Sequence, residues 1–158
     1  MSDEKSVQAT VTVLAPPETV WGIVSDLPRM GELSPENNGG TWLGGVTTPV
    51  VGARFRGRNA NGWRRWSTTA KVTQCTAPGR FAFEVSSFGF PVSAWSYVVD
   101  AVEGGCSVTE TWTDRRAGWF AAVGALVTGV ANRPEATRAS IEATLAALRQ
   151  KAEIDRTA

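Results

Sequence analysis

Apolar and polar residues alternate with a period of two along much of the chain, a pattern typical of β-strands that bury one face. The clearest example is residues 7–14, where valine and alanine alternate with glutamine and threonine. We predict six further strands, at residues 41–43, 53–59, 63–74, 81–86, 93–102 and 106–114. Short turns rich in glycine, proline and asparagine separate most of them, so we expect an antiparallel sheet joined mainly by hairpins.

The last part of the chain has helical spacing instead. Its apolar stripe has intervals of four, three and four residues and consists of Ile141, Leu145, Leu148 and Ala152. Asn132 is a suitable N-cap and Glu135 completes a capping box, so we expect a helix over residues 132–151. Two short helices are predicted earlier, over residues 17–27 and 30–36, and prolines mark their boundaries.

This order of one strand, two short helices, six strands and a long helix predicts an α+β fold. The apolar stripe of the last helix requires a partner, and the apolar faces of the strands supply one. We therefore expect a curved antiparallel sheet closed over this helix, with a ligand cavity between them. One domain is predicted over residues 7–152, between disordered tails at residues 1–6 and 153–158.

The composition narrows the chemistry that the chain offers. Its 158 residues carry a net charge of +1 and include no histidine, which excludes Ser–His–Asp and Cys–His catalysis and histidine metal sites. Cys75 and Cys106 lie far apart, so we expect buried free thiols, no metal and no cofactor. The first residues are unlike a signal peptide and the longest apolar run is too short to span a bilayer, so we expect a cytoplasmic protein without stable membrane insertion.

Strand alternation turns seven aromatic side chains inward, namely Trp42, Phe55, Trp66, Phe83, Trp95, Tyr97 and Trp112. One helix stripe of leucine, isoleucine and alanine is too small to fill so wide a sheet, and aromatic side chains suit a pocket for flat or apolar ligands. Core packing is the alternative for each of them taken singly. We predict that the cavity also includes Thr68, Val108, Glu110, Ile141 and Leu145.

Three residues are candidates for chemistry in this cavity. Glu110 shares the apolar face of its strand with Val108 and Trp112, where a carboxylate is costly unless it is paired or protonated. It is either a polar anchor or acid–base group for a ligand, or the structural partner of an arginine. Tyr97 carries the only phenol of the chain, a hydrogen-bond donor for a ligand carbonyl. Arg64 has the strand parity to reach Glu110 or a ligand carboxylate, and an exposed strand end is its alternative.

Two further features bear on partners. Residues 119–131 are apolar on nearly all sides, so they form a buried extension of the last helix, a lid that gates the cavity or, if exposed, a dimer or membrane-docking surface. Five arginines near two tryptophans resemble a nucleic-acid patch, namely Arg54, Arg56, Arg58, Arg64 and Arg65. The near-neutral net charge favours a solvated strand face instead, so we expect no nucleic-acid partner.

Several segments together carry a resemblance. A Pro-Pro-Glu-x-Val-Trp run at residues 16–21 follows the first strand, and Asp-Leu-Pro-Arg-Met and Leu-Ser-Pro-Glu lie within residues 26–36. Trp-Ser-Tyr at residues 95–97, Gly-Gly-Cys-Ser-Val-Thr-Glu at residues 104–110 and a last helix ending in Leu-x-x-Leu-Arg complete the pattern. Over nearly its whole length the chain resembles the START/Bet v 1-like (SRPBCC) superfamily, and within it the bacterial polyketide cyclase/dehydrase-like proteins.

The resemblance implies a helix-grip fold, in which a strongly bent seven-stranded sheet wraps a long C-terminal helix. It also implies an internal cavity for lipids, polyketides, sterols or other apolar molecules. Leu33 stands where relatives commonly have an aromatic residue, and Cys106 stands where they often have threonine. The resemblance therefore does not identify a particular ligand.

Three functions follow as expectations. The first is a protein that binds or carries a small hydrophobic ligand, such as a lipid or a polyketide. The second is a cyclase/dehydrase-type enzyme in which Glu110, Tyr97 or Arg64 moves protons, and a carboxyl group deep in the cavity with a raised pKa favours it. The third is a protein-interaction module, including a homodimer, that uses residues 119–131.

Overall fold

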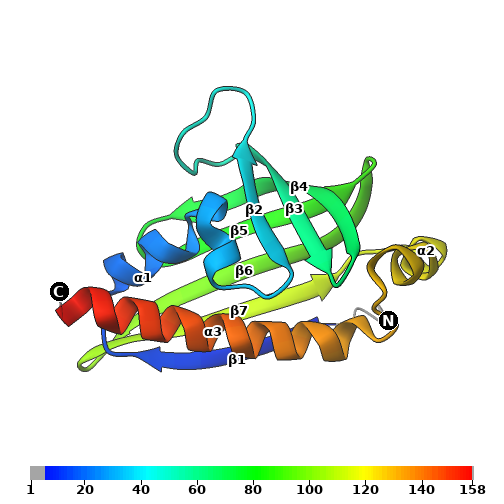
Figure 1. Ribbon diagram of the computed structural model, residues 1–158. Helices are drawn as coiled ribbons and strands as arrows, with labels where there is room; N and C mark the ends of the chain where they lie inside the picture. Colours follow the sequence, from blue (N-terminus) through cyan, green and yellow to red (C-terminus); the bar gives the residue numbers. More distant parts are fainter. Residues whose placement is uncertain (1–5, 158) are drawn as a thin grey trace, which may run out of the picture.

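The computed structural model describes residues 6–157, and its elements follow the predicted order (Figure 1). The strands are β1 (Ser6–Val13), β2 (Asn37–Trp42), β3 (Arg54–Asn61), β4 (Arg64–Thr76), β5 (Arg80–Ser87), β6 (Phe90–Val102) and β7 (Gly105–Asp114). The helices are α1 (Pro17–Val24), the 3-10 helix η1 (Leu27–Glu32), α2 (Gly118–Thr128) and α3 (Arg133–Thr157). All seven strands pair antiparallel in one sheet of order β1-β7-β6-β5-β4-β3-β2, so the predicted α+β helix-grip fold is confirmed.

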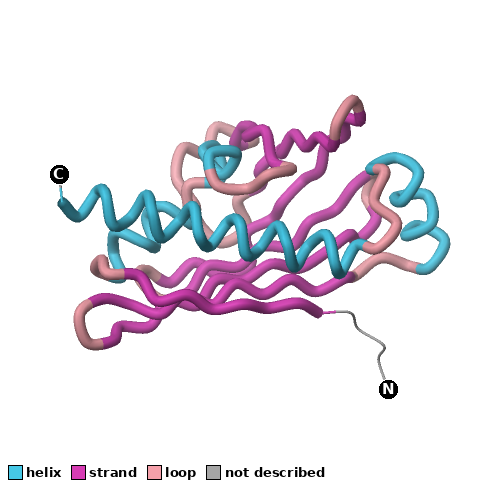
Figure 2. The backbone as a smooth tube through the Cα atoms, turned by 60° about the horizontal axis from the view of Figure 1, so that its bottom comes forward, coloured by secondary structure: helices cyan, strands magenta, loops and turns pink. Residues whose placement is uncertain are grey.

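Irregularities in strand pairing accompany the bend of the sheet. The register shifts between β2 and β3 near Gly40, between β4 and β5 near Gln74, and between β5 and β6 near Ser86. Bulges of this kind increase the local twist and bend a strand. Gly40 approaches the Arg56 carbonyl so closely that a Cβ has no room there. The bent sheet faces α3, which runs alongside β1 for much of the length of the molecule (Figure 2).

One end of the molecule is closed by α1. This helix packs against α3, β5 and β6, and its two buried side chains are Val20 and Val24. Trp21 anchors the same helix to the sheet, since its Nε1 donates a 3.2 Å hydrogen bond to the Arg80 carbonyl and its ring lies edge-on to Phe81. The apolar core therefore closes the interior at this end, and the strands continue beyond it toward α2.

Residues 119–131 are not an extension of α3. The separate helix α2 ends at Thr128 and is followed by Gly129, whose φ of 73° is the left-handed conformation common after a helix. The cap predicted for α3 is present, because Asn132 Oδ1 accepts a 3.2 Å hydrogen bond from the Glu135 backbone N–H. A left-handed glycine followed by a new cap turns the chain between the two helices.

Some boundaries differ from those predicted. The segment predicted as a helix at residues 30–36 is the 3-10 helix Leu27–Glu32, and β6 begins at Phe90 because the β5–β6 turn takes only two residues.

The ends of the domain also differ from the prediction. The helix α3 continues to Thr157, beyond the predicted end at residue 151, although residues 153–158 were predicted to be a disordered tail. Glu153 Oε1 accepts a 3.1 Å hydrogen bond from the Leu14 backbone N–H, which ties the extension to the end of β1. Of the predicted N-terminal tail, Ser6 already pairs in β1, and residues 1–5 lie outside the described part of the chain.

Candidate functional site

A pocket of about 550 Å³ lies between the bent sheet and α3, on the side of the molecule that α2 occupies. Inward-facing side chains of β3 to β7 form most of its wall, and η1, α2, α3, the start of β2 and neighbouring connections supply the rest. Phe88, Val123 and Val127 line the pocket and are also exposed, so it reaches the surface between the β5–β6 turn and α2. Its volume falls within the range of pockets that hold small ligands, about 300–1,000 Å³.

Most residues predicted for the cavity line this pocket. They are Phe55, Trp66, Thr68, Phe83, Trp95, Tyr97, Glu110 and Trp112. The register explains their convergence, since Phe83 pairs with Trp95 and Trp95 with Trp112 across three neighbouring strands. Directly paired residues share one face of a sheet, so the alternation along each strand builds a continuous aromatic wall.

Four predicted residues do not line the pocket. Trp42 packs edge-on against Phe55 with their ring centroids 5.4 Å apart, and Val108 is fully buried in the core. Ile141 and Leu145 are both buried in the core, and Leu145 also borders a separate groove between β1 and α3. The apolar stripe of α3 is therefore a core surface rather than a pocket surface.

The face of α3 that does line the pocket is polar, and the sequence analysis missed it. It consists of Thr137, Ser140 and Thr144, at intervals of three and four residues. This spacing places the three side chains on one side of the helix, and Thr137 and Thr144 are buried. The sequence feature that could have predicted this pocket face is a helical stripe of hydroxyl residues beside the apolar stripe.

Glu110 and Tyr97 form a buried pair at the pocket wall. They are directly opposite each other in β7 and β6, and the Tyr97 hydroxyl donates a 2.7 Å hydrogen bond to Glu110 Oε2. Glu110 is only 2% exposed, and its Oε1 is the one buried side-chain oxygen or nitrogen without a partner among the described residues. The strand alternation thus placed Glu110 correctly, and the structural arginine partner considered for it is not what the carboxyl group contacts.

Burial governs the protonation of this pair. Desolvation raises the pKa of Glu110 from 4.5 to about 8, and the hydrogen bond from Tyr97 only partly opposes this. The pKa of Tyr97 is raised well above 10, first by burial and then by the nearby Glu110 carboxylate. At neutral pH the pocket therefore presents mainly a neutral carboxylic acid beside a neutral phenol.

Arg64 does not approach Glu110. Its guanidinium carbon lies 4.4 Å from the centroid of the Trp63 ring, and its Nε donates a 3.4 Å hydrogen bond to the Leu126 carbonyl. The residue thus connects the β3–β4 turn to α2 at the surface. The prediction that it reaches into the cavity is not supported by this geometry, and the exposed strand end considered as its alternative describes it better.

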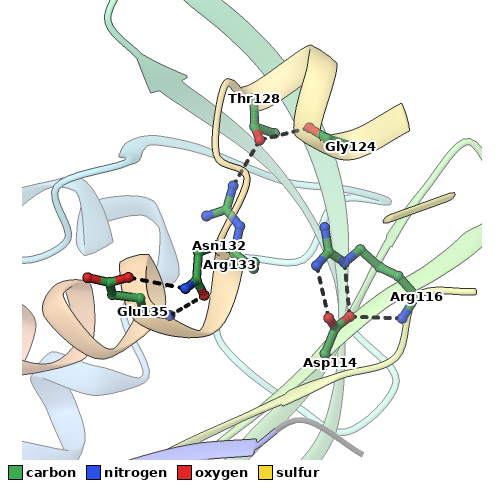
Figure 3. A network of polar contacts seen from close by, with 7 residues as sticks. All are labelled: Asp114, Arg116, Gly124, Thr128, Asn132, Arg133 and Glu135. Atoms are coloured by element: carbon green, nitrogen blue, oxygen red, sulfur yellow. Dashed lines mark hydrogen bonds and ion pairs between the residues drawn. The ribbon is translucent and has the colours of Figure 1, made fainter. Parts of the chain in front are cut away.

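Other arginines line the pocket near its opening, and carboxylates hold two of them in place. Arg116 contacts Asp114 through two 2.9 Å hydrogen bonds (Figure 3). Arg133 forms a 2.6 Å ion pair with Glu36, and it donates a 3.0 Å hydrogen bond to the Thr128 hydroxyl at the end of α2. Arg133 thereby connects the C-terminal end of α2 to the segment that precedes β2.

The described residues offer no metal centre and no membrane span. Among the side chains that the structure describes, residues 6–154, no three cysteine, aspartate or glutamate side chains converge on one point. No helix in that part of the chain combines the length and the apolar character needed to cross a bilayer. The pocket itself, with one buried acid among aromatic and hydroxyl side chains, is the candidate site.

Solved structures share this architecture. The Polyketide_cyc-like protein Cgl2372 from Corynebacterium glutamicum is 26% identical with a TM-score of 0.63, over 96% of this chain and 93% of that chain. Protein CV1439 from Chromobacterium violaceum is 12% identical with a TM-score of 0.70, over 94% of this chain and 97% of that chain. The di-domain ARO/CYC StfQ from the steffimycin biosynthetic pathway is 11% identical with a TM-score of 0.75, over 98% of this chain and 52% of that chain. At such low identities CV1439 and StfQ show the fold alone.

Sequence comparison gives the family. None of the curated proteins matches the chain. The family described as "Polyketide cyclase / dehydrase and lipid transport" matches residues 4–153, which is nearly the whole chain. The chain therefore belongs to this family of the SRPBCC superfamily, and its bent seven-stranded sheet packed around α3 agrees with that.

Proposed function

We propose that the protein binds a small, largely apolar molecule in the pocket and holds one polar group of that molecule at Glu110. The observation that carries this proposal is the unpartnered Oε1 of Glu110 at a mainly aromatic wall. A buried oxygen without a partner costs about 1–3 kcal/mol, and a hydrogen bond to a ligand removes that cost. The family description, which names polyketide cyclases, dehydrases and lipid transport, supports a ligand of this kind.

The geometry of the pair indicates which ligand group fits. Because Oε2 already accepts the hydrogen bond from the Tyr97 hydroxyl, a neutral Glu110 carries its own proton on Oε1. That oxygen donates a hydrogen bond, so its partner is an acceptor such as a ketone, ester or hydroxyl oxygen. The hydroxyl groups of Thr137, Ser140 and Thr144 on the opposite side offer further hydrogen bonds to an oxygenated chain or ring. The preferred ligand is apolar with a few oxygen atoms.

A cyclase/dehydrase-type enzyme is the second candidate. The specific observation that favours it is the same carboxyl group, because a pKa of about 8 suits a general acid or base near neutral pH. In such a reaction Glu110 exchanges its proton with the bound carbonyl compound while Tyr97 keeps the carboxyl group in place. The pocket holds the flexible substrate in a folded conformation, which lowers the entropic cost of ring closure.

Native mass spectrometry of the protein purified from its natural source tests the binding proposal. We expect a non-covalent mass on the wild type that disappears in Ser140→Phe, whose ring obstructs the pocket. Ala143→Phe is the matched control, because it places the same ring on the exposed side of α3 and leaves the pocket open. A bare wild-type mass, together with no thermal shift in a panel of fatty acids, fatty-acid esters and aromatic polyketides, contradicts the proposal.

Glu110→Gln separates the two candidates. Glutamine keeps a hydrogen-bonding side chain of the same length but exchanges no proton in the neutral range. For a carrier we expect this variant to retain the ligand within about tenfold of the wild-type affinity, the value of one hydrogen bond. For an enzyme we expect Glu110→Gln to bind the molecule but no longer to convert it. A wild type that returns every bound compound unchanged removes the enzymatic alternative.

A further inference from the structure

The opening of the pocket is surrounded by exposed apolar side chains. They come from the β3–β4 turn, the β5–β6 turn and α2, and we call them the docking face: Trp63, Phe88, Phe90, Trp119, Val123, Leu126 and Val127. These seven are the majority of the twelve exposed large apolar side chains among the described residues. Contacts between the three segments make them one surface, because Phe90 packs on Trp119 and Asn61 donates a hydrogen bond to the Thr128 carbonyl.

Folding does not account for the apolar character of this surface. No residue of α2 is buried, although the helix is apolar on nearly all sides. Phe88 is 94% exposed and has a φ of 53°, a left-handed conformation that asparagine or glycine adopts more readily in a two-residue hairpin. An exposed aromatic residue at a strained turn position contributes nothing to the core, so a contact outside the chain is the better explanation for it.

The charges around the docking face are mostly positive. Six arginines lie on its segments or directly beside them, namely Arg58, Arg64, Arg65, Arg115, Arg116 and Arg133. The carboxylates of the same region are Glu36, Asp114 and Glu135, and the first two already contact Arg133 and Arg116. The whole chain has a net charge of only +1, so positive charge is concentrated at the end of the molecule where the pocket opens.

We propose that the docking face binds the surface of a bilayer that contains anionic phospholipids. Tryptophan and phenylalanine favour the interfacial layer between headgroups and acyl chains, and arginines beside them attract lipid phosphates. Neither signal alone gives stable attachment, but the two together do. A second copy of the chain fits less well, because a two-fold contact through this face sets the same arginines against each other.

The position of the face also bears on ligand exchange. Phe88, Val123 and Val127 belong both to the docking face and to the pocket lining. With the face on a bilayer, an apolar ligand passes between the acyl chains and the pocket without crossing water. This consequence rests on the proposed function, whereas attachment to the bilayer does not.

Vesicle flotation of the full-length protein tests the proposal. We expect the protein to float with vesicles of phosphatidylcholine and phosphatidylglycerol, to bind phosphatidylcholine vesicles at least roughly tenfold less, and to dissociate from the anionic vesicles as salt is added. The double variant Trp63→Ser/Leu126→Ser removes two exposed apolar side chains, so we expect a loss of roughly tenfold or more. Val102→Ser is its control, since Val102 is 44% exposed and lies at the end of β6 opposite to Phe90.

The charge component has its own pair of variants. Arg58→Gln/Arg65→Gln should weaken binding to anionic vesicles several-fold and leave binding to neutral vesicles unchanged. Arg149→Gln removes an exposed arginine of α3 away from the docking face and should behave as the wild type.

Three outcomes of the flotation experiments overturn the proposal: equal flotation with both vesicle types, no flotation with either, or equal behaviour of docking-face variants and controls. So does a dimer that Trp63→Ser/Leu126→Ser dissociates. Ser140→Phe, in which a ring obstructs the pocket, should float as the wild type does. A failure of ligand binding can therefore be distinguished from a failure of membrane docking.

Discussion

The two ends of the molecule share one sheet but differ in packing: one end is a closed apolar core, and the other is open. At the end closed by α1, large side chains such as Val20, Phe81 and Leu148 are fully buried against one another. At the other end α2 buries no residue, the strands leave a pocket of about 550 Å³, and seven large apolar side chains face outward. The comparison indicates that the closed end supplies most of the stability, whereas the open end is available for ligands and surfaces.

The strand β7 shows this division within one element. Its inward-facing residues are Cys106, Val108, Glu110 and Trp112, in the order from the closed end to the open end. The first two are completely buried in the apolar core, and Glu110 and Trp112 line the pocket. A single alternating pattern therefore builds both the core and the site, and only the chemistry of the inward side chain differs.

The largest effect is expected from matched leucine truncations at the two ends. Leu148→Ala removes a side chain that is 0% exposed and leaves a cavity, so we expect a loss of roughly 3–5 kcal/mol in the free energy of unfolding. Leu126→Ala removes a side chain that is 79% exposed, so we expect a change within about 0.5 kcal/mol. Urea denaturation followed by circular dichroism measures both. Similar losses in the two variants contradict the division between the ends.

The next largest effect is a dependence of stability on pH that comes from Glu110. Its pKa is about 8 in the folded protein and near 4.5 in the unfolded chain, so the folded state binds the proton more tightly. The resulting stability is fully present below pH 4.5 and is lost as the pH rises through 8. Between pH 5 and pH 8 we expect a loss on the order of 3 kcal/mol that is absent in Glu110→Gln. Denaturation curves of both proteins at the two pH values give this difference directly, and parallel pH profiles contradict it.

A smaller effect is expected for the partner of that carboxyl group. Tyr97→Phe removes the 2.7 Å hydrogen bond to Glu110 Oε2 and keeps the ring, so we expect a loss of about 1–2 kcal/mol at pH 6. Because this hydrogen bond lowers the pKa of Glu110, its removal should move the titration of Glu110 above pH 8. Carbon-13 NMR of the glutamate side-chain carboxyl groups follows that titration. An unchanged or lowered midpoint in Tyr97→Phe means that the two side chains do not interact as described.

The smallest change in stability is expected when the pocket is filled. In Ser140→Phe the new ring enters open space instead of a packed core, so we expect the free energy of unfolding to change by less than about 1 kcal/mol. Thermal denaturation of Ser140→Phe beside Ala143→Phe measures this. A loss of several kcal/mol confined to Ser140→Phe shows that the space between α3 and the sheet is already occupied by packed side chains.

The strand pattern predicted much of the fold and of the pocket wall. Alternation alone turned Phe83, Trp95, Glu110 and Trp112 inward, because successive residues of a strand point to opposite faces. The orientation of α3 could not be derived in this way. A helix with an apolar and a hydroxyl stripe has two faces to bury, and only the position of β1 decides that the stripe with Thr144 meets the pocket.

Local sequence was also insufficient at the open end. The parity of Arg64 allowed an inward side chain as well as an exposed strand end, and in the structure its guanidinium group lies over the Trp63 ring and contacts α2. The pattern of residues 119–131 did not distinguish a continuous helix from a separate one. Both outcomes depend on how α2 docks beside the hairpin turns, a tertiary contact that no local periodicity encodes.

Titration with the apolar fluorescent probe N-phenyl-1-naphthylamine tests the central claim, that the open end holds an apolar ligand in the pocket, most directly. The wild type is compared with Ser140→Phe, which places a ring inside the pocket, and with Leu126→Ser, which alters only the exposed face. We predict saturable binding to one site in the wild type and in Leu126→Ser, and its loss in a folded Ser140→Phe. Undiminished binding in Ser140→Phe, or no saturable binding to the wild type, contradicts the account.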